Sequence, residues 1–365
     1  MVRPPIGLGA FPITISDLGL RSHRLPAAPP NSPQLLVLGD SFTFARQIGT
    51  EKIFTRQLEE RMEARFKIDL DVLNAGVPAY GTAQQLLFIR ELLQHHRVRP
   101  DLVMLVFFTN DILDNLCLSY VNLAPQPSRP CFTLRNDGLY RTQRPRKEIA
   151  AADDTLVEAQ TGGGLITVAL ARALGEQWIQ TKPGLVQLLG RLGVNVEVPR
   201  MPGLLNGWYR DDVIERGVPL TRALIKQIKQ EVEAAGGRLV VSMVPSPFQI
   251  YPDTYVPLLK RSFEGDPIID RFVRDMRRPQ KFVAEICREA GIPFQDLMST
   301  FLENNAEPLF IPSDGHLTEA GHDLIAPVLF DFVARYFAER QNGHRESASH
   351  RRTEPTRYNS EQLLR

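Results

Sequence analysis

Leu35-Leu36-Val37-Leu38-Gly39-Asp40-Ser41-Phe42 is the stretch that decides the fold. Four consecutive apolar residues that end at a glycine and two polar residues are typical of a strand buried on both faces of a parallel sheet. Two further apolar runs, Val72-Leu73 and 102–108, also lead into short stretches that contain polar residues, Asn74-Ala75-Gly76 and Thr109-Asn110-Asp111. Because ligands bind beyond the carboxyl ends of parallel strands, these three strand ends predict a functional edge.

Amphipathic helices are predicted between these strands. Apolar residues recur every four positions from Phe54 to Phe66, which marks one face of a helix. Further helices are predicted at about 82–96, 224–236, 279–291 and 318–337, the last capped by Thr318, and further strands at 239–244 and 294–297. Alternating strands and helices predict an α/β fold with a central parallel sheet covered on both faces.

The chain divides into a core and three less regular segments. Residues 1–33 are predicted to be an N-terminal extension and linker, and 34–340 the α/β domain. A large insertion at about 112–215, punctuated by Pro and Gly, separates the third and fourth core strands. Two interpretations of it stay open: a lid over the carboxyl edge of the sheet, or an elaboration remote from any site. The polar, charged tail 341–365 is predicted to be disordered.

Composition sets broad limits on function. The chain has 365 residues, 43% hydrophobic and 23% charged, with a formal net charge of +1. Such a balance gives no global attraction to nucleic acid, and no run approaches the ~20 apolar residues of a membrane-spanning helix.

The first residues, Met1 to Pro5, do not resemble a signal peptide. As written, the chain is expected in the cytoplasm, or in the periplasm or envelope if its N-terminus is truncated. The oligomeric state stays open.

The three cysteines do not form a disulfide framework. Cys287 lies in an apolar helical stripe and is expected in the core. Cys117 and Cys131 could pair if the protein reaches an oxidising compartment, so their state stays open.

The polar strand ends and one downstream loop together suit acyl transfer. A serine hydroxyl such as Ser41 needs a neighbouring base, and His316, in the loop Asp314-Gly315-His316, suits that role. Asp314 could orient the imidazole. The backbone N–H groups of Ser41 and Gly76 and the side-chain amide of Asn110 could donate to an oxyanion, with Gly76 allowing close approach of a substrate.

These four blocks, in this order, resemble those of the SGNH (GDSL-type) hydrolase family. The resemblance extends from about Leu35 to Phe337, without most of the insertion. It implies a three-layer flavodoxin-like sandwich and esterase, lipase or carbohydrate-deacylase chemistry, with no metal and no organic cofactor. Carried over by motif, it implies a nucleophile at Ser41, a base at His316, and oxyanion donors at Gly76 and Asn110.

The position of the acid departs from the family pattern. The acid of the family usually stands three residues before the histidine, where this chain has Ser313, whereas Asp314 stands two before. Some polysaccharide-acetylating relatives show the shorter spacing, so Asp314 is retained as the acid.

The segment Asp17-Leu18-Gly19-Leu20-Arg21 also resembles an N-terminal segment of bacterial members. Arg21 is expected to form a structural salt bridge rather than to contact substrate.

Each candidate residue has a plainer interpretation. Ser41 could merely cap a helix. Asp40 and Asp111 are expected to brace loops through backbone hydrogen bonds. His322 could join Asp314 and His316 as a metal ligand, but a packing role is expected, because the spacing is not a familiar one for ligands.

The function expected from these residues is serine-dependent hydrolysis of a carboxylic ester, with an O-acetyl or short acyl group on a carbohydrate or similar alcohol. One alternative is an O-acyltransferase that passes the same acyl group to a polysaccharide. Another is a catalytically silent glycan-binding relative. A nucleotide-binding role is disfavoured, because Gly39-Asp40-Ser41-Phe42-Thr43 lacks the GxGxxG spacing.

Overall fold

Five parallel strands form the central sheet of the protein. The computed structural model describes residues 12–21, 32–67, 69–94, 98–119, 123–126, 129–136, 138–142, 203–306, 308–311 and 315–352. The sheet has the order β2-β1-β3-β6-β7. Its strands are β1 (Gln34–Gly39), β2 (Asp71–Gly76), β3 (Leu102–Phe107), β6 (Arg238–Met243) and β7 (Phe294–Asp296). Counted along the core this is the order 2-1-3-4-5 of flavodoxin-like folds, as the resemblance implied.

The strand residues divide between two apolar layers. Successive side chains of a strand point to opposite faces, so Leu36 and Leu38 of β1 belong to one core and Leu35 and Val37 to the other. All four are fully buried. The sheet is therefore covered on both faces, which explains why its strands are continuous apolar runs.

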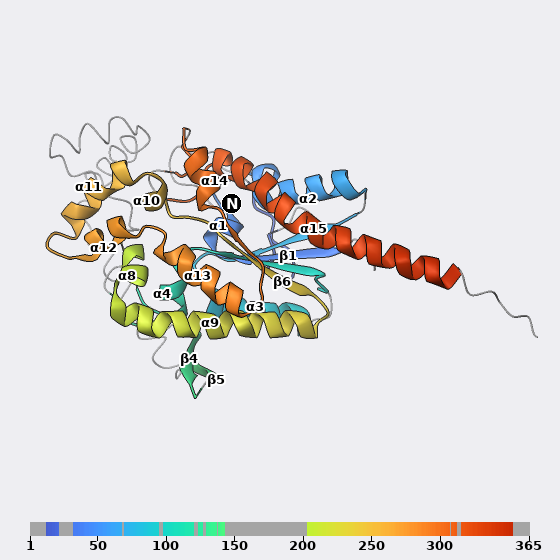
Figure 1. The fold of residues 1–365 in the computed structure, drawn as a ribbon, viewed down its shortest axis with the longest axis horizontal. Helices are drawn as coiled ribbons and strands as arrows, with labels where there is room; N and C mark the ends of the chain where they lie inside the picture. Colours follow the sequence, from blue (N-terminus) through green and yellow to red (C-terminus); the bar gives the residue numbers. More distant parts are fainter. Residues whose placement is uncertain are drawn as a thin grey trace, which may run out of the picture.

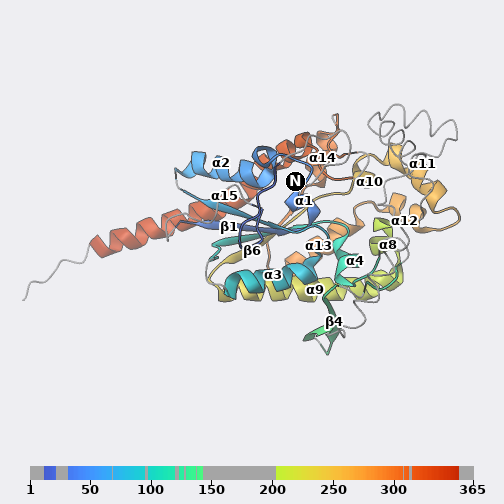
Figure 2. The same ribbon diagram turned by 180° about the vertical axis from the view of Figure 1, so that it is seen from behind.

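Helices form the outer two layers (Figures 1 and 2). One face carries α3 (Thr82–Gln94), α9 (Asp211–Ala234) and α13 (Arg278–Glu289). The other carries α2 (Phe54–Phe66), α14 (Met298–Glu303) and α15 (Glu319–Arg352). The shorter elements are α1 (Ser41–Phe44), η1 (Thr50–Lys52), α4 (Asp111–Asn115), α8 (Leu204–Tyr209), α10 (Pro247–Ile250), α11 (Pro252–Ser262) and α12 (Ile268–Arg274). Each predicted core helix is present, close to its expected bounds at most ends.

The described segments of the insertion lie in two separate places. Strands β4 (Cys131–Arg135) and β5 (Gly138–Thr142) form an antiparallel hairpin that contacts α9 and projects from the helical layer (Figure 1). The helix α8, in contrast, lies at the carboxyl edge, because the indole Nε1 of Trp208 donates to the Thr109 carbonyl at 2.7 Å. Residues 143–202, the larger part of the insertion, lie outside the described residues.

The C-terminal helix is longer than expected. Thr318 caps it, since its Oγ1 accepts from the Gly321 N–H at 3.1 Å, and the helix continues to Arg352. The prediction of disorder from 341 is therefore wrong for 341–352, where a helix extends beyond the body of the domain (Figure 1). Residues 353–365 lie outside the described part.

Within the described part of the chain, the structure contains no helix with the length and apolar character that crossing a membrane requires.

Candidate active site

The carboxyl ends of β1 and β3 bring the first candidate residues together. These two strands are neighbours, with Leu38 opposite Leu105. Ser41 follows β1 and Asn110 follows β3. Because β2 lies on one side of β1 and β3 on the other, both residues lie at the point where the strand order changes direction. Such a switch point is the usual ligand site of an open parallel sheet.

Ser41 is the first residue of the short helix α1. Asp40 caps this helix, because its carboxylate accepts from the Phe42 N–H at 2.9 Å. The interpretation of Ser41 as the helix cap is therefore wrong. The N–H of a first helical residue has no intrahelical acceptor, so the backbone N–H of Ser41 suits donation to a ligand.

Ser41 and His316, 275 residues apart in sequence, meet at this edge. The Ser41 Oγ lies 2.7 Å from the His316 Nε2. His316 is held in a tight loop, in which its carbonyl accepts from the Ile311 N–H at 2.7 Å. Gly315 has a φ of +75°, which a residue without a Cβ adopts at little cost. In the tautomer with an unprotonated Nε2, the hydroxyl donates directly to the imidazole.

Asp314, the expected acid, lies outside the described residues, as do Pro312 and Ser313. Its described neighbour Gly315 donates its N–H to the Ile311 carbonyl at 2.8 Å.

Asn110 lies among buried carboxylates. Its Nδ2 donates to the Asp114 Oδ2 at 2.7 Å, and its amide also interacts with Asp40, the residue before Ser41. Asn110 is therefore near Ser41 and has a fixed side chain, although one of its N–H groups is already donated.

Gly76 occupies a different position from the one expected. Its N–H donates to the Asn74 Oδ1 at 3.0 Å, so it is not available to an oxyanion in this arrangement. A Cβ added at Gly76 would lie 2.4 Å from the Phe44 N and 2.7 Å from the Thr43 carbonyl carbon. The missing side chain thus permits close packing of β2 on α1, rather than close approach of a substrate.

Two buried carboxyl groups at this edge, those of Asp40 and Asp111, have raised pKa values. Burial raises the pKa of Asp40 to about 6, an effect opposed by the hydrogen bond from Phe42 and by the nearby His316. Burial, followed by the charge of Asp40, raises the pKa of Asp111 well above its ordinary value. Asp111 also accepts from the Phe108 N–H at 2.8 Å. The expectation that Asp40 and Asp111 brace loops through backbone hydrogen bonds is confirmed.

Arg21 stabilises the helix that carries the serine. It is 2% exposed, and its guanidinium donates to the carbonyls of Phe44, Ala45 and Ile48, the last at 2.6 Å. Its partners are thus backbone carbonyls at the C-terminal end of α1, where a cation is favourable, and in the loop that follows. The predicted salt bridge is replaced by this cap.

His322 has a packing role. It is buried, stacks on Phe54 with ring centroids 5.8 Å apart, and accepts from the Phe54 N–H at 3.3 Å. Burial, with the charge of Arg21, lowers its pKa to about 3, so the imidazole is neutral. Among the described residues, no three His, Cys, Asp or Glu side chains gather as a metal site would require.

The cysteines divide into one pair and one buried thiol. Cys117 and Cys131 form a disulfide, with the sulfur atoms 2.02 Å apart. Cys287 is buried, and this burial raises the pKa of its thiol to about 12.

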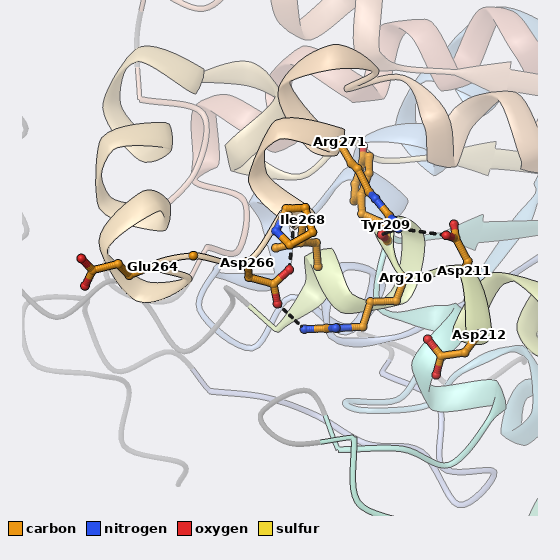
Figure 3. Close-up of a pocket in the computed structure, with 10 residues that line it drawn as sticks. Tyr209, Arg210, Asp211, Asp212, Glu264, Asp266, Ile268 and Arg271 are labelled. Carbon is orange, nitrogen blue, oxygen red and sulfur yellow. Dashed lines mark hydrogen bonds and ion pairs between the residues drawn. The ribbon is translucent and has the colours of Figure 1, made fainter.

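A polar pocket lies beyond the carboxyl edge, next to α8 (Figure 3). It has a volume of about 570 Å³, and its walls come from α8, the start of α9, and 264–271. Arg210 pairs with Asp266 at 2.6 Å, and Arg271 pairs with Asp211 at 3.1 Å. The pocket does not include Ser41 or His316. Tyr209, which lines the pocket, follows Trp208 in the sequence, and Trp208 contacts the carboxyl edge of the sheet at Thr109.

Two groups near the site were not found from the sequence. Asp114 lies four residues after Asn110, one helical turn along α4, and that spacing was an available signal. Arg129, which pairs with Asp114, comes from an irregular segment with no motif around it. No pattern in the sequence marks it.

The fold and the contact between Ser41 and His316 define a class of protein: a flavodoxin-like α/β domain that presents the serine–histidine pair typical of serine hydrolases. The model of the GDSL-like lipase/acylhydrolase family matches residues 37–324, so the chain belongs to that family. It is a hydrolase that acts on ester bonds.

Several solved structures are similar to this chain at low sequence identity. A lipase/acylhydrolase from Enterococcus faecalis is 12% identical with a TM-score of 0.40, covering 82% of this chain and 95% of that one. The acetyl xylan esterase AlAXEase is 12% identical with a TM-score of 0.39, covering 82% and 99%. A catalytic mutant of an acetylxylan esterase from Geobacillus stearothermophilus is 13% identical with a TM-score of 0.39, covering 83% and 94%. No curated protein sequence matches the chain.

Proposed function

We propose that the protein hydrolyses a carboxylic ester through an acyl-serine intermediate on Ser41. The observation that carries this proposal is the 2.7 Å separation between the Ser41 Oγ and the His316 Nε2. A hydroxyl at that distance can pass its proton to the imidazole as it attacks a carbonyl.

The proposed reaction has two displacement steps. Ser41 attacks the ester carbonyl while His316 takes its proton, and His316 then returns that proton to the departing alcohol. A water molecule next attacks the acyl-serine with His316 again as base, which releases the carboxylic acid and restores Ser41. In this proposal Asp314 orients the imidazole and stabilises the imidazolium. The Ser41 N–H and the Asn110 amide donate to the oxyanion.

The proposed substrate is an O-acetyl or other short acyl group on a carbohydrate or similar alcohol. In this proposal the polar pocket beside α8, which does not include Ser41 or His316, receives a part of the alcohol away from the ester (Figure 3). Its walls carry paired arginines and carboxylates, among them Arg210 with Asp266. Ligand pockets are mostly apolar, so a wall of this composition suits hydroxyl groups better than a long acyl chain.

We also propose that the protein matures in an oxidising compartment, such as the periplasm or cell envelope. The disulfide between Cys117 and Cys131 supports this proposal, because such bonds are rare in the reducing cytoplasm.

Covalent labelling tests the nucleophile. A fluorophosphonate should modify the wild-type chain at Ser41, as located by peptide mass spectrometry, and should not modify Ser41→Ala. The exposed Ser299 offers a matched control, since Ser299→Ala should label like the wild type. Labelling at another residue, or no labelling of folded and active protein, would refute the assignment.

Product analysis tests the reaction. The wild type should release acetate from an acetylated xylo-oligosaccharide in water. Transfer of the acetyl group to added, unacetylated oligosaccharide in preference to water would instead identify an O-acyltransferase. Binding of the oligosaccharide with neither reaction would identify a glycan-binding protein.

A further inference from the structure

Arg129 is connected to the proposed oxyanion site through a single intermediate residue. The Asn110 Nδ2 donates to one carboxylate oxygen of Asp114, and the Arg129 guanidinium donates to the other. Asp114 is fully buried, whereas the Arg129 side chain is 21% exposed. The carboxylate therefore joins the amide at the site to a cation nearer the surface.

The negative charges around Asp114 give the positive charge of Arg129 an electrostatic role. Asp40 and Asp111 are buried beside Asp114, and the three carboxyl groups interact electrostatically. An oxyanion at the carbonyl of a bound ester would add a negative charge to the same region. In a poorly solvated site, a fixed cation next to Asp114 reduces that repulsion at the moment the oxyanion forms.

The position of Arg129 is set by its own segment. Two residues later, Cys131 is bonded to Cys117, just after α4. Between them, the Pro130 carbonyl accepts from the Gln84 Nε2 of α3 at 2.8 Å. Arg129 thus belongs to a segment tied to both α3 and α4, and its guanidinium reaches Asp114 from a fixed backbone.

We propose that Arg129 is a positioning residue for the ester hydrolase reaction: through Asp114 it fixes the Asn110 amide and offsets the carboxylate charge facing the oxyanion. This inference rests on the proposed oxyanion role of Asn110. The interaction with the oxyanion exists only in the transition state, so Arg129 acts on kcat and hardly on KM.

Steady-state kinetics with p-nitrophenyl acetate test this inference. Arg129→Met should lower kcat about 10- to 100-fold with KM changed less than about twofold, and Arg129→Lys should restore most of the loss. Arg135→Met, an exposed arginine on β4, is the matched control and should behave as the wild type. Wild-type kcat in Arg129→Met would refute the inference.

A charge-balanced double variant tests the route through Asp114. Asp114→Asn removes the negative charge and keeps an oxygen that can accept from the Asn110 amide. Arg129→Met/Asp114→Asn should therefore have a kcat within about threefold of Asp114→Asn alone, even if Arg129→Met by itself does not fold. A kcat at least tenfold below that of Asp114→Asn would refute the inference and indicate a packing role for the arginine.

These experiments distinguish a failure of the proposed function from a failure of the role inferred for Arg129. Wild-type protein without esterase activity, or turnover that survives in Ser41→Ala, would refute the serine mechanism itself. An active, Ser41-dependent wild type with an unaffected Arg129→Met refutes the role of Arg129 alone.

Discussion

Gly76 donates its backbone N–H to the side chain of Asn74 at 3.0 Å, two residues earlier on the same strand. The Asn74 Nδ2 donates in turn to the Thr43 carbonyl in α1 at 2.8 Å. The end of β2 is therefore bonded to the helix that begins with Ser41. This contact assigns Asn74 and Gly76 to the positioning of that helix.

Gly76→Ala should destabilise the fold. The added Cβ would meet the backbone of Thr43 and Phe44 at less than 3 Å, and neither atom belongs to a flexible side chain. Overpacking of this kind costs about 3 kcal/mol, measurable as a lower urea midpoint. Ala79→Gly is the control, because Ala79 is exposed with a φ of +65° and should tolerate glycine. An unchanged midpoint in Gly76→Ala would contradict the packing role.

Ser41 and His316 should act as one unit in catalysis. Ser41→Ala and His316→Ala should each reduce kcat by more than about 10⁴-fold, and the double variant should be no slower than either single one, because each removal disables the same proton transfer. Turnover of an activated acetyl ester measures this. Losses that multiply in the double variant would show that the two residues act independently.

Asn110→Ala should reduce kcat about 10²- to 10³-fold, the usual loss for one oxyanion donor. It should also lower stability by about 1–3 kcal/mol, because buried Asp114 loses a hydrogen bond. Asn304→Ala, at an exposed asparagine, controls for loss of an amide side chain. If Asn110→Ala lowered stability while kcat stayed unchanged, its role would be structural.

Asp111 should make stability fall as pH rises. Its folded-state pKa is raised above 3.8 by burial. As pH increases through 4, the unfolded chain loses this proton before the folded chain does, so the free energy of unfolding decreases. Asp111→Asn should gain stability relative to the wild type from pH 4 to pH 8, measured as the difference in urea midpoints. A difference that is constant over this range would contradict burial of an ionisable group at this position.

The disulfide should be detectable by thiol titration. Denatured protein without reductant should expose one thiol, from Cys287, and three after reduction. The variant Cys117→Ser/Cys131→Ser should lose about 3 kcal/mol of stability, as expected for a closed segment of this length. Three thiols before reduction would contradict the pairing.

The core of the fold was predictable because its signals are local. A strand buried on both faces must be apolar at consecutive positions, and Leu35 to Leu38 meet that condition. The helix from Phe54 to Phe66 was equally visible from its apolar spacing. The hairpin formed by β4 and β5 was not predicted, because its strands alternate weakly and only the start of β4, at Cys131 and Phe132, is buried.

The candidate site was predictable in part. Ser41, Asn110 and His316 could be found because each follows a recognisable strand end or precedes a predicted helix. The misassignment of Gly76 arose because a glycine can serve either a nearby ligand or nearby backbone, and residue type does not distinguish the two. The cap formed by Arg21 was missed for a related reason, since carbonyl acceptors leave no pattern in side-chain identity.

By itself, the sequence determined the order of strands and helices and the residue types at the strand ends, because periodic burial and turn chemistry depend on neighbours along the chain. Tertiary structure alone decided that the Ser41 hydroxyl meets an imidazole 275 residues away, that Gly76 packs against α1, and that Arg129 reaches Asp114. Those outcomes depend on distances between segments remote in sequence. Packing of the sheet and its two helical layers sets these distances.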